Sequence, residues 1–238
     1  MHMKKAGFPP EVPFNFAKAY SAMSLKHRAA YPRYLRLNKL LQEEKGHITM
    51  ETIRRIQRDH FEGESIAPRW SPADGLQVSI CMHAMLDTAS KTAAASHVEL
   101  TKEHTPVWWS AFAVPCMSIF APYAIDAELP ECISEAGAVY AENSAWWQFE
   151  RLQYAIEKDY PRYMKWWRPE ADILEEELKK QVEQTGKPDA KQIAKNTERV
   201  LRKVEEAFGK IIAEKGDSGQ PQHMDMNETA KKRAEIEF

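Results

Sequence analysis

Residues 105–126, TPVWWSAFAVPCMSIFAPYAID, form the most apolar run of this 238-residue chain. The run contains no Lys, Arg or Glu, and it is divided by Pro106, Pro115 and Pro122. A helix of this length does not tolerate proline in its interior, and a membrane span needs about 20 apolar residues with fewer breaks. The run therefore predicts two short buried strands, 107–113 and 117–121, joined by a bend at 114–116.

Two segments before this run predict further strands. Residues 76–83, LQVSICMH, alternate between polar and apolar side chains. Residues 91–100, KTAAASHVEL, are a weaker candidate because small residues are poor strand formers. Four successive strands with short connections predict an antiparallel sheet, and the fold class is therefore α+β.

Helical periodicity flanks the predicted sheet on both sides. Amphipathic helices are expected over 31–44 and 49–61, with Thr49 as the N-cap of the second. Further helices are expected over 143–160, with a break near Pro161, and over 170–185 and 189–215. The pattern divides the chain into a sheet core at 1–135, a helical extension packing on it at 136–215, and a flexible tail at 216–238.

Composition argues against several classes of function. The formal net charge of −2 argues against a nucleic-acid partner, which would require a basic excess. An odd number of cysteines, three, argues against a disulfide framework. The first residues contain no apolar core of the kind found in signal peptides, so a cytoplasmic protein without membrane contact or cofactor is expected.

The RDHFEG run at residues 58–63 combines a cation, two acids and an imidazole at a predicted helix end. His60 could act as a general base, and Arg58 could hold a carboxylate through a two-pronged hydrogen bond. The alternative is a solvated helix end, where charged residues are common.

The histidines and cysteines form no recognisable ligand pattern in the sequence. His83 and His97 lie on adjacent predicted strands and could approach each other, but spacing fixes no third ligand and no CxxC is present, so no metal site is predicted. Cys81 and Cys116 are interpreted as buried small hydrophobic residues rather than nucleophiles. The candidate pocket residues are Arg58, Asp59, His60, Glu62, His83 and His97.

The order of these segments resembles the C-terminal part of the PepD-type dipeptidases, a family that includes the secernins. The segments are RDHFEG, SICMH, TAAASHVEL, WWSAFAVPCMSIFAPYAI and LPE, in that order. Residues 115–122 match the family's Pro-Cys-x-Ser-aliphatic-aromatic-x-Pro run. The resemblance covers roughly residues 14–130.

The resemblance implies an N-terminal-nucleophile hydrolase fold (αββα), in which two packed sheets lie between helix layers, and it implies hydrolysis of dipeptides. The nucleophile of that family is a cysteine at the mature N-terminus, which is expected upstream of this chain because residue 1 is Met and residues 2–80 contain no Cys. Cys116 is then a structural cysteine.

On this interpretation, the partners are a short peptide substrate and an N-terminal half or a second copy of the chain. The alternative is a non-catalytic binding or structural module that pairs with a partner through its helices.

Overall fold

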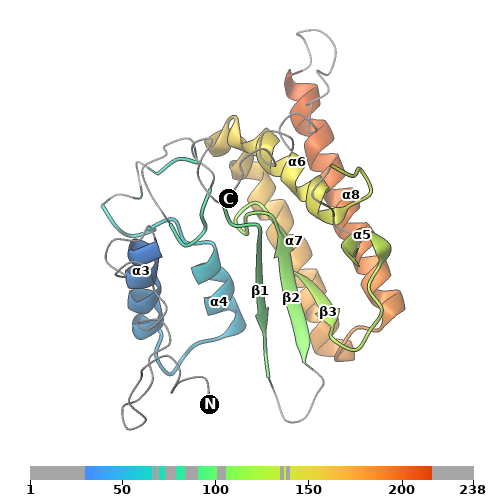
Figure 1. The fold of residues 1–238 in the computed structure, drawn as a ribbon, viewed down its shortest axis with the longest axis horizontal. Coiled ribbons are helices and arrows are strands. Elements are labelled where there is room, and N and C mark those ends of the chain that lie inside the picture. Colours follow the sequence, from blue (N-terminus) through green and yellow to red (C-terminus); the bar gives the residue numbers. More distant parts are fainter. Residues whose placement is uncertain are drawn as a thin grey trace, which may run out of the picture.

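The computed structural model describes residues 30–65, 67, 70–72, 79–83, 91–100, 106–134, 137 and 140–215. Within these residues, two helices are followed by three strands and four further helices (Figure 1). Their bounds are α3 Ala30–Glu43, α4 Met50–Gln57, β1 Ala94–Val98, β2 Val107–Phe112, β3 Ala121–Ala124, α5 Glu131–Ser134, α6 Ala145–Glu157, α7 Tyr160–Thr185 and α8 Ala190–Lys215. Among the described helices, none is both long enough and apolar enough to cross a bilayer. The predicted tail at 216–238 lies outside the described residues.

The strands form one antiparallel sheet in the order β1-β2-β3, which confirms a mixed fold with an antiparallel sheet. The prediction of a strand over 107–113 is confirmed by β2. The prediction of a strand over 117–121 is wrong, because β3 begins only at Ala121 and includes Pro122. β3 is the edge of this sheet, where a proline removes no central hydrogen bond.

In the connection between β2 and β3, backbone carbonyls are hydrogen-bonded by side chains rather than by a neighbouring strand. Trp167 Nε1 donates to the carbonyl of Met117 at 2.8 Å, and Arg168 Nη1 donates to the carbonyl of Ser118 at 2.7 Å. Both side chains come from α7. The backbone of 115–120 therefore remains irregular although it is fully buried.

The predicted strand over 76–83 is not found in its described part. Residues 79–83 are irregular, and residues 73–78 lie outside the described residues. The described chain thus contains three sheet strands rather than four. Residues 79–83 are instead held by side-chain and turn contacts, such as the bond from the Met82 amide to Thr92 Oγ1 at 3.0 Å.

Helices cover both faces of the sheet. α6 and α8 pack on one face, where Phe149 of α6 meets Phe112 of β2 at a ring distance of 6.2 Å. On the other face, the guanidinium of Arg54 from α4 lies 4.3 Å from the centre of the Trp109 ring. The sheet and the C-terminal helices share one buried hydrophobic cluster.

Two helix ends differ from the expected positions in ways that matter for the site. Thr49 caps α4 as predicted, accepting a hydrogen bond from the Thr52 amide at 3.1 Å. However, α4 ends at Gln57 rather than near Phe61, so the RDHFEG run forms a turn. The helix is interrupted between α6 and α7, just before Pro161, as predicted. α7 begins at Tyr160, ten residues before the predicted start at 170, and it continues through Pro169.

Candidate functional site

Three segments that are distant in the sequence meet beyond the C-terminal end of α4. They bring together His60, Cys81, His83 and Cys116, which we call the Cys2His2 cluster. Their exposed fractions are 6%, 0%, 1% and 4%, in that order. One side-chain nitrogen or sulfur atom from each residue lies within 4.8 Å of the other three.

The turn after α4 positions the first of these side chains. Phe61 has a φ of 69°, a left-handed conformation that is unusual for a bulky residue and turns the chain sharply after His60. Two local bonds support this turn: the Phe61 amide donates to Asp59 Oδ1 at 3.1 Å, and the His60 amide donates to Glu62 Oε2 at 2.6 Å. The imidazole of His60 therefore points inward.

The second segment is tied directly to this turn. The Cys81 amide donates to the carbonyl of Asp59 at 3.1 Å. Cys81 and His83 are two residues apart in an irregular, non-helical segment, and such alternate side chains can lie on the same side. Both side chains face His60.

Cys116 comes from the connection between β2 and β3. Arg58 Nε, from the turn after α4, donates to the carbonyl of Pro115 at 2.9 Å. Arg168 Nη1 donates to the carbonyl of Cys116 itself at 3.2 Å. The backbone of this connection is therefore fixed from two sides, which holds the thiol against the two histidines.

The geometry is centred on Nε2 of His83. This atom lies 3.3 Å from Nε2 of His60, 3.3 Å from Sγ of Cys116 and 3.7 Å from Sγ of Cys81. One ring nitrogen carries at most one proton, so these three contacts cannot all be hydrogen bonds donated by His83.

Each histidine has a carboxylate at its other nitrogen. His83 Nδ1 lies 2.8 Å from Glu157 Oε1 of α6, and His60 Nδ1 lies 3.4 Å from Glu62 Oε1. Carboxylates in this position fix the ring orientation and the tautomer, as is common for histidines that ligate metals. The Trp70 ring stacks on His60 at 3.8 Å.

The close packing shifts the acid–base behaviour of the cluster. Burial alone raises the pKa of Cys116, but the bond to Cys81 and the charges of His83 and His60 outweigh burial and hold this pKa well below its usual range. Burial lowers the pKa of His83, but the Cys116 thiolate and Glu157 outweigh it and raise the pKa to about 9. In the absence of a metal, the cluster therefore favours a thiolate beside an imidazolium.

Two kinds of chemistry are compatible with these residues. A thiol, an imidazole and a carboxylate in series, here Cys116, His83 and Glu157, also form the catalytic unit of cysteine hydrolases. However, Cys116 is only 4% exposed, so a substrate carbonyl could not reach it without movement. Two cysteines and two histidines with converging lone pairs are also the donor set of tetrahedral zinc sites.

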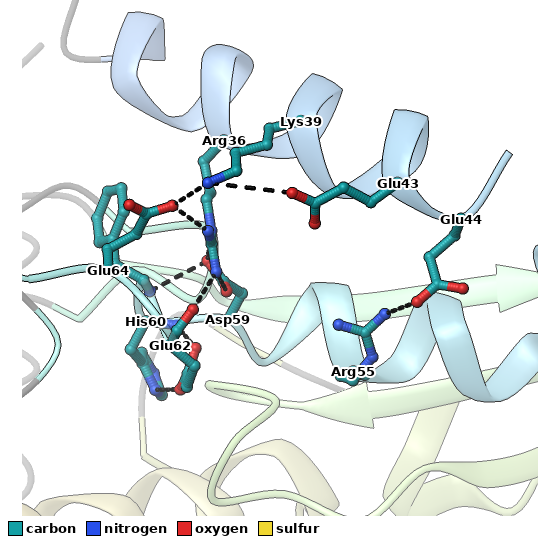
Figure 2. Close-up of polar contacts among 10 residues, drawn as sticks. Arg36, Lys39, Glu43, Glu44, Arg55, Asp59, His60, Glu62 and Glu64 are labelled. Atoms are coloured by element: carbon teal, nitrogen blue, oxygen red, sulfur yellow. Dashed lines mark hydrogen bonds and ion pairs between the residues drawn. The ribbon is translucent and has the colours of Figure 1, made fainter.

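The outer side of the same turn has a different character. It borders a groove of about 620 Å³, which α3, α4 and α7 also line. Figure 2 shows Arg36 and Lys39 of α3 reaching Asp59, Glu62 and Glu64 of the turn. The groove carries acidic and basic side chains along its length; its exposed members are Lys39, Glu43, Glu51, Arg55, Glu62 and Asp172.

A third polar region, which we call the arginine cluster, lies beneath Phe120. It consists of Arg54, Arg58, Arg168, Glu175 and His97. Glu175 bonds Arg58 and accepts from the Phe120 amide at 2.8 Å. His97 Nε2 accepts from Arg54 Nε at 3.2 Å, and burial together with the Arg54 charge lowers the pKa of His97 to about 4.

The predicted site residues are therefore separated into three places. His60 and His83 enter the Cys2His2 cluster, Asp59 and Glu62 face the groove, and Arg58 joins the arginine cluster while also lining the groove. The predicted approach of His83 to His97 is not observed, because His97 bonds Arg54 and Gln57 instead. The expectation of no metal site stays a prediction, although four potential ligand atoms converge in the Cys2His2 cluster.

Sequence reasoning missed the contribution of Cys81, Cys116 and Glu157. The signal that could have found the first pair was Cys-x-His at 81–83, since alternate residues outside a helix can share one side. Nothing in the sequence spacing pointed to Glu157, which is 74 residues from His83.

Comparison with known proteins does not identify the chain: no family model matches it, and no curated protein matches it significantly.

Proposed function

We propose that this chain is the C-terminal portion of a hydrolase of short peptides, similar to the PepD-type dipeptidases. One observation carries the proposal: three of the five segments on which the resemblance rests meet in a single place. Residues 58–63 bond the 115–122 run through Arg58, and residues 79–83 bond residues 58–63 through Cys81.

The groove on the outer side of the turn is suited to such a substrate. Its volume of about 620 Å³ falls within the range of roughly 300–1,000 Å³ found for small-molecule sites. A dipeptide with free ends carries an ammonium group at one end and a carboxylate at the other. Exposed Glu51 and Arg55 offer both charges within one groove, where a substrate carboxylate would replace Glu44, the present partner of Arg55 at 2.6 Å.

A binding experiment tests this part of the proposal. The chain is titrated by calorimetry with alanyl-alanine and with the same dipeptide acetylated and amidated at its ends. We expect saturable binding of the free dipeptide and at least tenfold weaker binding of the blocked one. Arg55→Ala should weaken binding, whereas Arg202→Ala, an exposed arginine of α8 outside this groove, should not. Equal binding of both peptides would refute the assignment of the groove.

Hydrolysis is tested separately, because the proposed nucleophile lies in an N-terminal half. Dipeptide cleavage is measured for this chain and for the chain extended by its upstream coding sequence. We expect turnover only in the extended protein, abolished by replacing its N-terminal cysteine with alanine. Turnover by the present chain, lost in Cys116→Ala, would instead favour Cys116 as the nucleophile.

A partner-binding module is the second candidate, and α3 is the observation in its favour. This helix exposes three large apolar side chains, Tyr34 at 49%, Leu35 at 49% and Leu37 at 37%. Exposed apolar clusters of this kind are typical of interaction surfaces. Light scattering of the wild type and Leu35→Lys tests it: self-association that the variant abolishes supports the module, and a monomeric wild type counts against pairing of identical copies.

A further inference from the structure

We infer that the Cys2His2 cluster binds one zinc ion, with His60 Nε2, His83 Nε2, Cys81 Sγ and Cys116 Sγ as ligands. The inference does not depend on the hydrolase proposal, because it rests on the positions of four side chains and not on any reaction. It assigns a metal to a chain whose sequence contains no zinc-binding spacing.

Three of the six distances between the ligand atoms, those from His83 Nε2 to the other three, match a tetrahedral zinc site, and all six are within 4.8 Å. With Zn–S bonds of about 2.3 Å and Zn–N bonds of about 2.0–2.1 Å, tetrahedral angles place two nitrogens about 3.3 Å apart and a nitrogen and a sulfur about 3.6 Å apart. The two Nε2 atoms of His60 and His83 are 3.3 Å apart. The sulfurs of Cys116 and Cys81 lie 3.3 Å and 3.7 Å from His83 Nε2.

Hydrogen bonding alone gives a poorer account of this arrangement. Glu157 and Glu62 face the Nδ1 atoms of His83 and His60, and a neutral ring places its proton on the nitrogen that faces a carboxylate. A single proton on His83 Nε2 can be donated to only one of its three close neighbours, which are His60 Nε2, Cys116 Sγ and Cys81 Sγ. A cation at the centre of the four atoms would contact all of them at once.

The surroundings are those of a structural site rather than a catalytic one. All four positions of a tetrahedral ion are taken by protein atoms, which leaves no position for water or substrate. The four residues are at most 6% exposed, and the ring of Trp70 covers His60. The ion would join the turn after α4, the irregular segment 79–83 and the β2–β3 connection, and Glu157 would link it to α6.

Sulfur ligands select among the metals that this site could take. Thiolates with imidazoles in tetrahedral geometry favour Zn²⁺, whereas Mg²⁺ and Ca²⁺ prefer oxygen ligands. No carboxylate oxygen belongs to the set of four atoms; Glu157 and Glu62 bond the far sides of the histidine rings.

Metal content and cobalt spectroscopy test the inference. The protein is purified without a histidine tag, and zinc is measured by mass spectrometry. We expect one zinc per chain. After removal by a chelator, Co²⁺ should give strong visible absorption typical of tetrahedral cobalt, together with a thiolate-to-cobalt charge-transfer band. A folded protein that is metal-free and does not take up cobalt, or one whose cobalt spectrum lacks the thiolate band, would overturn the assignment.

Matched variants distinguish this site from adventitious surface metal. Cys116→Ser and His83→Gln should lose stoichiometric zinc, whereas Cys132→Ser and His97→Gln, which alter a cysteine and a histidine outside the cluster, should retain it. Equal retention by all four variants would mean an adventitious ion only. If the ligand variants do not fold, the wild-type cobalt spectrum decides, because it requires no substitution.

Discussion

The Cys2His2 cluster and the arginine cluster are both buried and polar, but the first has an excess of lone pairs and the second an excess of N–H donors. The arginine cluster contains three guanidinium groups and one buried carboxylate, Glu175. Most of its surplus donors are used: Arg58 and Arg168 bond backbone carbonyls of the β2–β3 connection, and Arg54 lies over the Trp109 ring. Arg168 Nη2 is buried without a hydrogen bond and lies 3.4 Å from Glu175 Oε1. Backbone carbonyls and an aromatic ring therefore compensate part of the positive charge.

The Cys2His2 cluster has a surplus of electron-pair donors instead. Its two sulfurs and two Nε2 atoms face one another, and the carboxylates of Glu157 and Glu62 are directed to the outer nitrogens. Two histidines express this contrast: the pKa of His83 is raised to about 9 by its anionic neighbours, whereas burial and Arg54 lower that of His97 to about 4. The difference is one of sign: the arginine cluster has an excess of N–H donors, whereas the Cys2His2 cluster has an excess of lone pairs that the proposed zinc ion would accept.

The largest expected effect comes from the only carboxylate buried within the arginine cluster. Glu175→Ala should reduce the free energy of unfolding by about 3–5 kcal/mol, because it leaves buried guanidinium groups without a counter-charge. Urea denaturation measures the loss. Glu176→Ala, on the exposed side of the same helix, is the control and should change stability by less than about 0.5 kcal/mol. Equal effects would mean that the arginines do not depend on Glu175.

The next effect concerns the carboxylate behind His83. Glu157→Ala should weaken zinc binding by about 10–100-fold, because the imidazole loses the partner that fixes its orientation. Competition with a chromophoric chelator measures the affinity. Glu142→Ala, an exposed acid before α6, should leave the affinity unchanged. An unchanged zinc affinity in Glu157→Ala would show that Glu157 does not support the metal site.

The pH dependence of stability tests the other side of the comparison. The pKa of His97 falls to about 4 in the folded protein from about 6.5 when unfolded. Between these values the unfolded chain binds more protons, so stability should decline as pH falls from about 6.5 to 4, by on the order of 1–2 kcal/mol. Urea midpoints across this range measure the decline. His97→Gln should reduce the slope, and an identical slope would assign it to other groups.

The smallest expected effect comes from the N-cap of α4, a helix that supports both clusters. Thr49→Ala should cost about 1 kcal/mol, because the N-terminus of α4 loses its side-chain cap. α4 carries Arg54 and leads into the turn that holds Arg58 and His60. Thermal unfolding of metal-loaded and metal-free protein should show the same loss. A loss confined to one form would show that the cap acts on only one of the clusters.

Local features of the chain could be read from its sequence. Proline spacing and apolar content predicted β2 and excluded a long helix over 105–126. Thr49 and the helical periodicity predicted α4, α6 and α8, because caps and amphipathic faces depend on neighbouring residues. The strand prediction over 117–121 failed for a long-range reason. Side-chain hydrogen bonds from α7 hold this segment, and no local pattern in the sequence reveals them.

The candidate site shows the boundary between sequence and tertiary structure most clearly. The sequence by itself determined which chemical groups are available: RDHFEG, Cys-x-His at 81–83 and the Pro-Cys run at 115–116. Only the tertiary structure decided which of them meet, placing His60 rather than His97 beside His83 and adding Cys116 from 33 residues away. The physical reason is that these ligands lie in irregular segments, whose paths are set by long-range hydrogen bonds and burial rather than by backbone periodicity.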